Sequence, residues 1–231
     1  MDFDSLSQRY YGGIARHYDG SRENSRQWAN ERAAVEMFFD KLPTGLSVID
    51  VPVGTGRFVE IYKRRNLAAK GIDASSDMLQ LAREKIEKAG FEMPLALGDI
   101  RAIDEPDENF DVAVCVRFLN WIDDADVLAA VLQLRRVSRK HLILGVRHFV
   151  PVHEIRPFST QGLKRYSRQL LRRAKGHIIA RRAPKIIVHE KSRVMQIFDD
   201  CGLNIVSQVC VDSSRNGTDY NIYLLEKRAG K

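Results

Sequence analysis

Short apolar runs alternate with amphipathic stretches along the first part of the chain. The apolar runs are rich in Val, Ile and Leu, as buried strands are. They are residues 47–51, 67–73, 95–97, 110–116 and 141–146. Apolar residues at helical spacing lie between them, over residues 57–65, 76–90 and 123–138. Strands that alternate with helices predict right-handed βαβ crossovers and a largely parallel α/β sheet.

Both ends of the chain extend this pattern. Residues 1–44 show helical spacing, for example at Leu6, Tyr10 and Ile14. Near the other end, we expect a helix over residues 189–201. Two strands joined by a turn-rich segment then follow, at 203–211 and 220–226. These strands predict an antiparallel hairpin that closes a doubly wound, seven-stranded, mostly parallel sheet.

The chain is expected to form one domain built from four segments. They are an N-terminal helical cap (1–44), a ligand-binding core (45–150), a basic helical insertion (151–190), and a C-terminal helix with the closing hairpin (191–231). A chain of 231 residues is long enough to bury a full core in one such domain.

The composition is that of a globular protein, with 44% hydrophobic and 29% charged residues. The first residues are acidic and polar, unlike a secretory signal. No apolar run approaches the ~18 residues expected of a membrane-spanning helix. The three cysteines form neither a CxxC pair nor a zinc spacing, so we expect no disulfide framework and no metal site. These features predict a cytoplasmic protein.

The net charge of +7 is concentrated in one segment. Between Arg156 and His189 the sequence has ten Lys and Arg residues and no acid. Residues 162–175 place most of these charges on one side of an amphipathic helix. Such a helix attracts an anionic partner or lies on an anionic membrane surface; the plainer interpretation is a solvated face.

Residues 48–58 carry the clearest chemical signal. A buried strand runs into Gly54 and Gly56, which allow positive φ, and then into a helix. Backbone N–H groups of such a loop point at a ligand. The dinucleotide pattern GxGxxG fails, because Pro52 takes the place of its first glycine, and no GK[ST] ending of a P-loop follows. The loop therefore fits a nucleoside ligand without a cradled polyphosphate.

Two acids follow the next strands. Asp73 ends the second strand, where a carboxylate can accept both hydrogen bonds of a ribose diol. Its alternative role is a favourable charge at the start of the next helix. Asp99, after Gly98, is an acceptor for an adenine amino group or else a turn residue. All these residues fall at carboxyl ends of strands, where parallel α/β sheets bind ligands.

These segments together resemble the class I S-adenosylmethionine-dependent methyltransferases. The matching segments are residues 48–56 (the first motif), 71–79 (the ribose-binding segment), 98–100 (the adenine-binding segment) and 110–115 (the fourth strand). The resemblance covers about residues 10–147. It implies a Rossmann-like fold, methyltransferase activity and S-adenosylmethionine as cofactor, with residues 45–150 as the cofactor-binding core.

The resemblance also implies a set of cofactor-binding residues. They are Tyr18, Asp50, Pro52, Gly54, Gly56, Asp73, Ala74, Met78, Asp99, Ile100 and Arg117. The family usually has glycine where Pro52 stands, and proline removes an N–H, so we interpret Pro52 as a tolerated turn. Two of these residues have alternative roles. Tyr18 is then a core tyrosine, and Arg117 is a surface arginine paired with Asp123 or Asp124.

Methyl transfer does not demand a dedicated base, because positioning two reactants can contribute about 7–11 kcal/mol. His148, His153 and His189 flank the region where family members receive their acceptors. Each is a candidate base or a structural histidine. His141 opens a strand and Cys115 lies inside one, so both are predicted to be structural.

The basic insertion is the best indication of the methyl acceptor. As a substrate lid, it would bring Arg165, Arg168 and Arg172 to an anionic small molecule or glycan that is methylated on oxygen or nitrogen. Aromatic residues are sparse there, which disfavours stacking on RNA bases. The alternatives are an RNA-directed methyltransferase and a non-catalytic, cofactor-binding partner subunit, with the oligomeric state left open.

Overall fold

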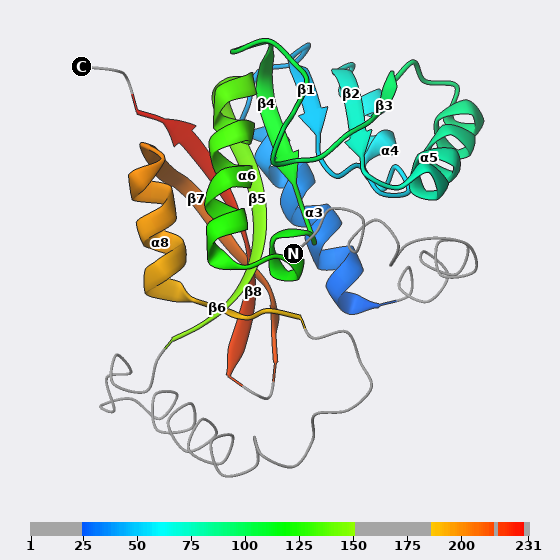
Figure 1. Ribbon diagram of the computed structural model, residues 1–231. Helices are drawn as coiled ribbons and strands as arrows, with labels where there is room; N and C mark the ends of the chain where they lie inside the picture. Colours follow the sequence, from blue (N-terminus) through cyan, green and yellow to red (C-terminus); the bar gives the residue numbers. More distant parts are fainter. Residues whose placement is uncertain (1–24, 151–185, 215–216, 229–231) are drawn as a thin grey trace.

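The described residues form one eight-stranded sheet with helices on both faces (Figure 1). The computed structural model describes residues 25–150, 186–214 and 217–228. The strands are β1 (Ser47–Asp50), β2 (Ala68–Asp73), β3 (Leu95–Leu97), β4 (Phe110–Cys115), β5 (Ser138–Phe149), β6 (His189–Glu190), β7 (Leu203–Ser213) and β8 (Thr218–Lys227). The helices are α3 (Arg26–Asp40), α4 (Val59–Arg64), α5 (Ser76–Ala89), the 3₁₀ helix η2 (Leu119–Trp121), α6 (Asp124–Val137) and α8 (Lys191–Asp200).

The strand order is β3-β2-β1-β4-β5-β8-β7, and the short β6 pairs with the end of β5. Strands β1 to β5 run parallel to one another, whereas β8 runs antiparallel to both β5 and β7. The predicted α/β class, the seven strands and the closing hairpin are therefore confirmed, and β6 is an additional strand. The strand order switches direction between β1 and β4, which is where a ligand crevice is expected.

Two apolar layers attach the helices to the sheet. Helices α6 and α8 cover one face, and α3, α4 and α5 cover the other (Figure 1). In β1, Val48 packs in the second layer and Ile49 in the first, and both side chains are fully buried. Each such burial contributes about 1.5–3 kcal/mol. A strand covered on both faces is apolar at consecutive positions, which explains the pattern that predicted it.

Helices α5 and α6 begin where the sequence predicts. The Ser75 hydroxyl accepts a hydrogen bond from the Met78 N–H, and Gly90 ends α5 in a left-handed conformation with φ of +59°. The Asp123 carboxylate caps α6 by accepting from the N–H groups of Ala125 and Asp126. These boundaries are set by capping residues within a few positions, so the sequence displays them directly.

Strand β5 corrects the prediction for His141. The strand begins at Ser138, so His141 lies inside it instead of opening it. Its register partner is Glu226 on β8. On the β4 side the pairing already begins at Ser138, which faces Phe110, whereas the pairing with β8 begins at His141.

Two helices start later than predicted. Helix α4 begins at Val59, not Arg57, because the turns of the glycine loop continue through residue 58. Helix α8 begins at Lys191, because His189 is extended and pairs with β5.

Several predictions fall outside the described residues. They concern the helical cap up to residue 24, most of the basic insertion (residues 151–185), and Tyr18, His153, Arg165, Arg168 and Arg172. Within the described ranges, no helix combines the length and the apolarity needed to cross a membrane.

Candidate functional site

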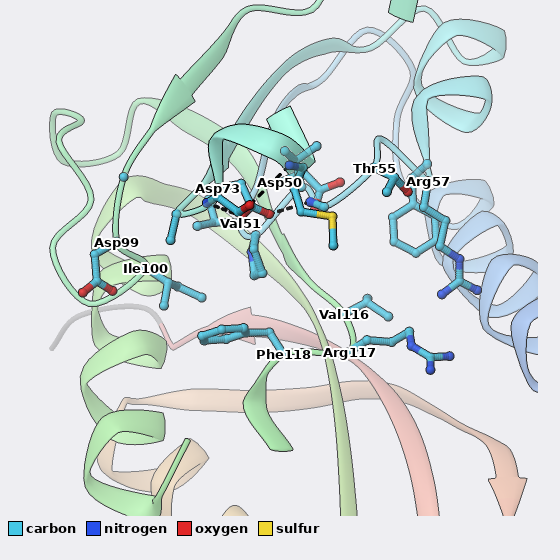
Figure 2. Close-up of a pocket in the computed structure, with 18 of the residues that line it drawn as sticks. Asp50, Val51, Thr55, Arg57, Asp73, Asp99, Ile100, Val116, Arg117 and Phe118 are labelled. Atoms are coloured by element: carbon cyan, nitrogen blue, oxygen red, sulfur yellow. Dashed lines mark hydrogen bonds between the residues drawn. The ribbon is translucent and has the colours of Figure 1, made fainter. Parts of the chain in front are cut away.

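A cavity lies at the carboxyl ends of β1, β2 and β4. It holds about 940 Å³ of empty space, including the part open to solvent. Its lining comes from residues 50–55, 57–58, 73–75, 78, 98–100 and 116–118 and from Trp28 of α3. Figure 2 shows Asp99 at one end of this cavity, Asp73 in the middle, and Arg57 and Arg117 at the other end.

Most of the residues that the resemblance assigned to cofactor binding are found in the lining of this cavity. They are Asp50, Pro52, Gly54, Asp73, Ala74, Met78, Asp99, Ile100 and Arg117. Gly56 is not among the lining residues. Its φ is +72°, and a Cβ there would lie 3.4 Å from the Cα of Ala82 in α5. Gly56 therefore allows the loop to turn and to pack closely against α5.

Backbone hydrogen bonds tie the glycine loop to β2. The Val53 N–H donates to Ile72 O at 2.8 Å, and the Gly54 N–H donates to Asp73 Oδ2 at 2.8 Å. Gly54 has φ of +57°, which glycine adopts without steric cost. The two residues after Pro52 thus supply the N–H groups that hold the loop in place.

Asp73 is a buried carboxylate held by two loops. Its Oδ1 accepts from the Ser75 N–H at 2.9 Å, and its Oδ2 from the Gly54 N–H. Burial raises the pKa of Asp73 to about 6, although backbone hydrogen bonds from residues 75, 54 and 74 act in the opposite direction. An ionised carboxylate has about four lone-pair sites, so these three backbone donors still leave it able to accept from a ligand hydroxyl.

Asp50 is a second buried acid in the same wall. Its Oδ2 accepts from the Tyr62 hydroxyl at 2.8 Å. Burial raises the pKa of Asp50 to about 7, and the nearby charge of Asp73 adds to this effect. A cationic ligand would stabilise the ionised forms of both acids.

Asp99 marks the opposite end from the arginines. Its carboxylate accepts from Arg101 Nε at 3.0 Å and from Arg101 Nη2 at 2.8 Å. Arg101 also donates to Asp126 at 3.2 Å, so the loop after β3 is fastened to α6. The neighbouring Ile100 is buried and offers an apolar surface to the cavity.

At the other end, two arginines share one buried carboxylate that sequence reasoning missed. Glu31 of α3 is fully buried and forms ion pairs with Arg57 and with Arg117, the latter at 3.2 Å. The Arg57 guanidinium lies 3.7 Å from the centre of the Trp28 ring and donates to Trp28 O at 2.6 Å. Glu31 follows Trp28 on the buried face of α3, and a carboxylate on such a face was the available signal.

Arg117 reaches this cluster from an unusual backbone conformation. Its φ is +69°, which is uncommon for any residue other than glycine. The Arg117 N–H donates to the Tyr220 hydroxyl at 2.8 Å, and the Trp121 indole N–H donates to Arg117 O at 3.1 Å. Tertiary contacts thus hold Arg117 in place, and it forms an ion pair with Glu31, whereas the alternative interpretation of the sequence paired it with Asp123 or Asp124.

The candidate bases His148 and His189 do not line the cavity. His148 is buried, with Nε2 2.7 Å from the Tyr223 hydroxyl and 3.0 Å from Asn221 Nδ2. His189 is buried, with Nδ1 2.6 Å from Asp124 Oδ1 and Nε2 2.8 Å from a backbone carbonyl of η2. Both fasten parts of the fold together, so neither is retained as a candidate base.

The protein matches known families over this same region. A family model described as "Methyltransferase domain" matches residues 48–141. The phosphatidylethanolamine N-methyltransferase of Cereibacter sphaeroides is 38% identical over 152 residues, which cover 64% of this chain and 70% of that protein. The chain belongs to the class I S-adenosylmethionine-dependent methyltransferases. It is an enzyme whose cofactor is S-adenosylmethionine.

Other proteins resemble parts or all of this methyltransferase. The dTDP-4-amino-2,3,4,6-tetradeoxy-D-glucose N,N-dimethyltransferase of Saccharopolyspora spinosa is 31% identical over 151 residues, and the match spans 64% of this chain and 55% of that protein. The magnesium protoporphyrin IX methyltransferase of Synechocystis PCC 6803, solved with bound S-adenosylmethionine, has a TM-score of 0.66. That match covers 99% of this chain and 98% of the other at 15% identity, which shows the shared fold.

The residues of the cavity fit the cofactor of this methyltransferase. S-adenosylmethionine carries a ribose diol, positive charge on sulfur and nitrogen, and a carboxylate. Asp73 and Asp50 offer acceptors and negative charge in the middle of the cavity. Arg57 Nε is buried and has no acceptor among the described residues, and an amino-acid carboxylate would provide one.

Proposed function

We propose that this methyltransferase transfers a methyl group to a nitrogen or oxygen atom of an anionic small molecule or glycan, with nitrogen as the favoured acceptor atom. The observation that carries the proposal is the charge distribution of the cavity. Acids line its middle and one end, whereas Arg57 and Arg117 line the end beside a second cavity. Two relatives have names that combine a phosphate with an amine: phosphatidylethanolamine and a dTDP-linked amino sugar.

The cofactor would lie along the cavity with its adenosine toward Asp99. Asp73 would accept from the ribose hydroxyls, and the apolar side chain of Ile100 would pack on the adenine. The Gly54 loop would lie against the middle of the molecule, with Asp50 near its positive charge. Arg57 would hold the carboxylate of the methionine end. The positions of these side chains along the cavity support this order.

The chain's own contribution to the reaction would be positioning. When bound, the cofactor supplies an electrophilic methyl group on a sulfonium ion. Glu31 fixes Arg57 and Arg117 at one end of the cavity, so both cations are placed before the acceptor arrives. Holding two reactants in line can contribute about 7–11 kcal/mol, and an amine that arrives neutral requires no base at the transfer step.

The alternative of an RNA-directed enzyme rests on residues 151–185, which lie outside the described residues. The roles of Arg165, Arg168 and Arg172 as substrate contacts therefore stay predictions, as does the lid.

The first experiment tests the cofactor site by calorimetry with S-adenosylhomocysteine. Asp73→Ala should weaken binding by about 10- to 100-fold, because hydrogen bonds to a charged group contribute about 1.5–3 kcal/mol each. Asp77→Ala is the matched control, since Asp77 lies in the first turn of α5 outside the cavity lining. We expect its affinity to stay within about threefold of the wild type. Equal losses in the two variants would contradict the proposed role of Asp73.

The second experiment tests the acceptor class. Methyl transfer from S-adenosylmethionine is measured with a panel of phosphorylated amines and their unphosphorylated counterparts, such as O-phosphoethanolamine and ethanolamine. We expect transfer to members of the phosphorylated set and little to their counterparts. Equal transfer to both sets, or transfer to RNA alone, would contradict an anionic small-molecule acceptor.

A further inference from the structure

A second, smaller cavity adjoins the cofactor cavity. It holds about 470 Å³ of empty space, including its open part, and Arg117 lines both cavities. Trp121, Arg147 and Tyr220 form much of the remaining wall. Among the described residues that line it, the charged ones are the two arginines, with no acid. Aromatic walls with arginines at the edge suit a small ligand that carries negative charge.

Arg147 lies near the carboxyl end of β5 and has more N–H groups than its protein partners use. Its Nη2 donates to Asp212 at 2.6 Å and its Nη1 to Thr218 at 3.4 Å, whereas a guanidinium has five N–H donors. The guanidinium also lies 5.5 Å from the centre of the Tyr220 ring. Its side chain is only 15% exposed, so an oxyanion in the cavity would meet it in a medium less polar than water.

Asn120 fixes the backbone that carries Arg147. Asn120 Oδ1 accepts from the Arg147 N–H at 2.7 Å, and Nδ2 donates to Arg147 O at 2.8 Å. The same Nδ2 donates to Ile187 O at 2.7 Å, and the Ile187 N–H donates to Asn120 O at 2.8 Å. These bonds join η2, β5 and the segment that enters β6. The Arg147 backbone is therefore ordered before any ligand binds, which lowers the entropic cost of binding.

Tyr220 fixes the other arginine. Its hydroxyl accepts from the Arg117 N–H, and its ring fits only because residue 145 is glycine. A Cβ on Gly145 would overlap the hydroxyl oxygen and lie 3.1 Å from Cζ. Arg117, which follows β4 and lines both cavities, is thus held by Tyr220 of β8, for which Gly145 of β5 leaves room.

We propose that this second cavity binds the anionic group of the methyl acceptor, a phosphate or a carboxylate, and that Arg147 determines the specificity for it. The inference rests on the proposed function, because it places the acceptor beside the cofactor cavity. Arg117 faces both cavities and contributes charge at their junction, while Arg147 belongs to the acceptor cavity alone. Substitution of Arg147 should therefore affect acceptor binding and leave cofactor binding unchanged.

The test uses calorimetry on the full chain saturated with S-adenosylhomocysteine, with phenyl phosphate, benzoate and neutral benzyl alcohol as probes. We expect at least one anion to bind and the alcohol not to. Arg147→Gln should weaken anion binding by about tenfold or more, the factor expected for losing one charge-assisted contact. Arg139→Gln is the matched control, because Arg139 lies on the same strand and pairs with one acid, Asp111, outside both cavities. Its anion affinity should stay within about twofold.

The outcomes separate this inference from the proposed function. Tighter binding of phenyl phosphate identifies a phosphate site and tighter binding of benzoate a carboxylate site, and Arg147→Lys should keep part of either affinity. Equal binding of benzyl alcohol, no anion binding, or an unchanged anion affinity in Arg147→Gln would overturn the inference even when S-adenosylhomocysteine binds normally. A wild-type protein that does not bind S-adenosylhomocysteine would instead contradict the cofactor site itself.

Discussion

The two cavities share Arg117 but are built in opposite ways. In the cofactor cavity, backbone N–H groups of the loops after β1 and β2 hold the carboxylate of Asp73. In the second cavity, the side chains of Asn120 and Tyr220 hold the backbone of Arg147 and of Arg117, and the Arg147 charge is balanced by Asp212. The first cavity therefore depends on local backbone geometry, and the second on long-range packing and on paired charges.

The two cavities also differ in the charges of the side chains that face them. Acids face the middle of the cofactor cavity, where a sulfonium ion would gain from them. Arginines face the second cavity and are balanced by acids placed behind them, Glu31 and Asp212. Removing a balancing acid should therefore be more damaging than removing a contact in the cofactor cavity.

The largest expected effect comes from Glu31, the buried carboxylate between two arginines. Glu31→Gln should lower the free energy of unfolding by about 3–5 kcal/mol, because it leaves buried positive charge without compensation. Urea denaturation followed by circular dichroism measures this loss. Glu36→Gln is the matched control on the same helix, since Glu36 pairs with Arg64 at the surface and should lose less than about 1 kcal/mol. Similar losses in the two variants would contradict the claim that Glu31 compensates buried positive charge.

A smaller effect is expected at Gly145, where the second cavity depends on packing. Gly145→Ala should lower the free energy of unfolding by about 1–3 kcal/mol, because the added methyl overlaps the Tyr220 hydroxyl. The double variant Gly145→Ala with Tyr220→Phe removes the overlapping oxygen and should recover part of the loss. The same denaturation experiment compares the two variants. No recovery in the double variant would contradict the overlap as the cause.

The same difference in construction explains what the sequence could predict. Asp73, Gly54 and Asp99 lie in short segments that each end a strand, so their spacing was enough to place them at one edge of the sheet. The predicted helical range 76–90 agrees with α5 for the same local reason, because its caps, Ser75 and Gly90, directly flank the helix. Interactions within a few residues are visible in a sequence without knowledge of the fold.

The second cavity was not predictable in this way. Arg147 and Tyr220 meet only because β5 and β8 pair in register, and Glu31 meets Arg117 only because the fold brings α3 to the segment after β4. His148 and His189 were candidate bases because of their position in the chain, but long-range contacts bury them among structural partners. Partners that lie far apart in sequence are set by tertiary packing, which a single sequence does not display.

After Glu31 and Gly145, the next largest predicted effect is a pH dependence of stability that comes from two acids of the cofactor cavity. The pKa values of Asp50 and Asp73 are raised to about 7 and about 6, above the ordinary value of 3.8. The folded protein thus keeps protons that the unfolded chain has already released. The free energy of unfolding of the ligand-free protein should therefore fall as the pH rises from about 4 to 7.

Binding of S-adenosylmethionine should follow the opposite trend, because its positive charge favours the ionised acids. Its affinity should rise by about tenfold between pH 5 and pH 7.5 and then level off, as expected for about one pKa unit of coupling. Calorimetry over this range measures the trend. Asp50→Asn should remove the part of the rise near pH 7, and an unchanged profile in that variant would exclude Asp50 as its source.

The smallest effect is expected at Arg101, which fastens Asp99 at the end of the cofactor cavity where we propose that the adenine lies. The Arg101 backbone N–H also donates to Asp99 Oδ1 at 2.9 Å, and this bond stays in the variant. Arg101→Gln should therefore weaken S-adenosylhomocysteine binding by less than about threefold. Arg83→Gln on the exposed side of α5 is the control, and calorimetry compares both with the wild type. A loss of tenfold or more in Arg101→Gln alone would show that the adenine end, like the second cavity, depends on ion pairs between side chains. The contrast between the two cavities would then hold only for the segment around Asp73, where backbone N–H groups hold the acid.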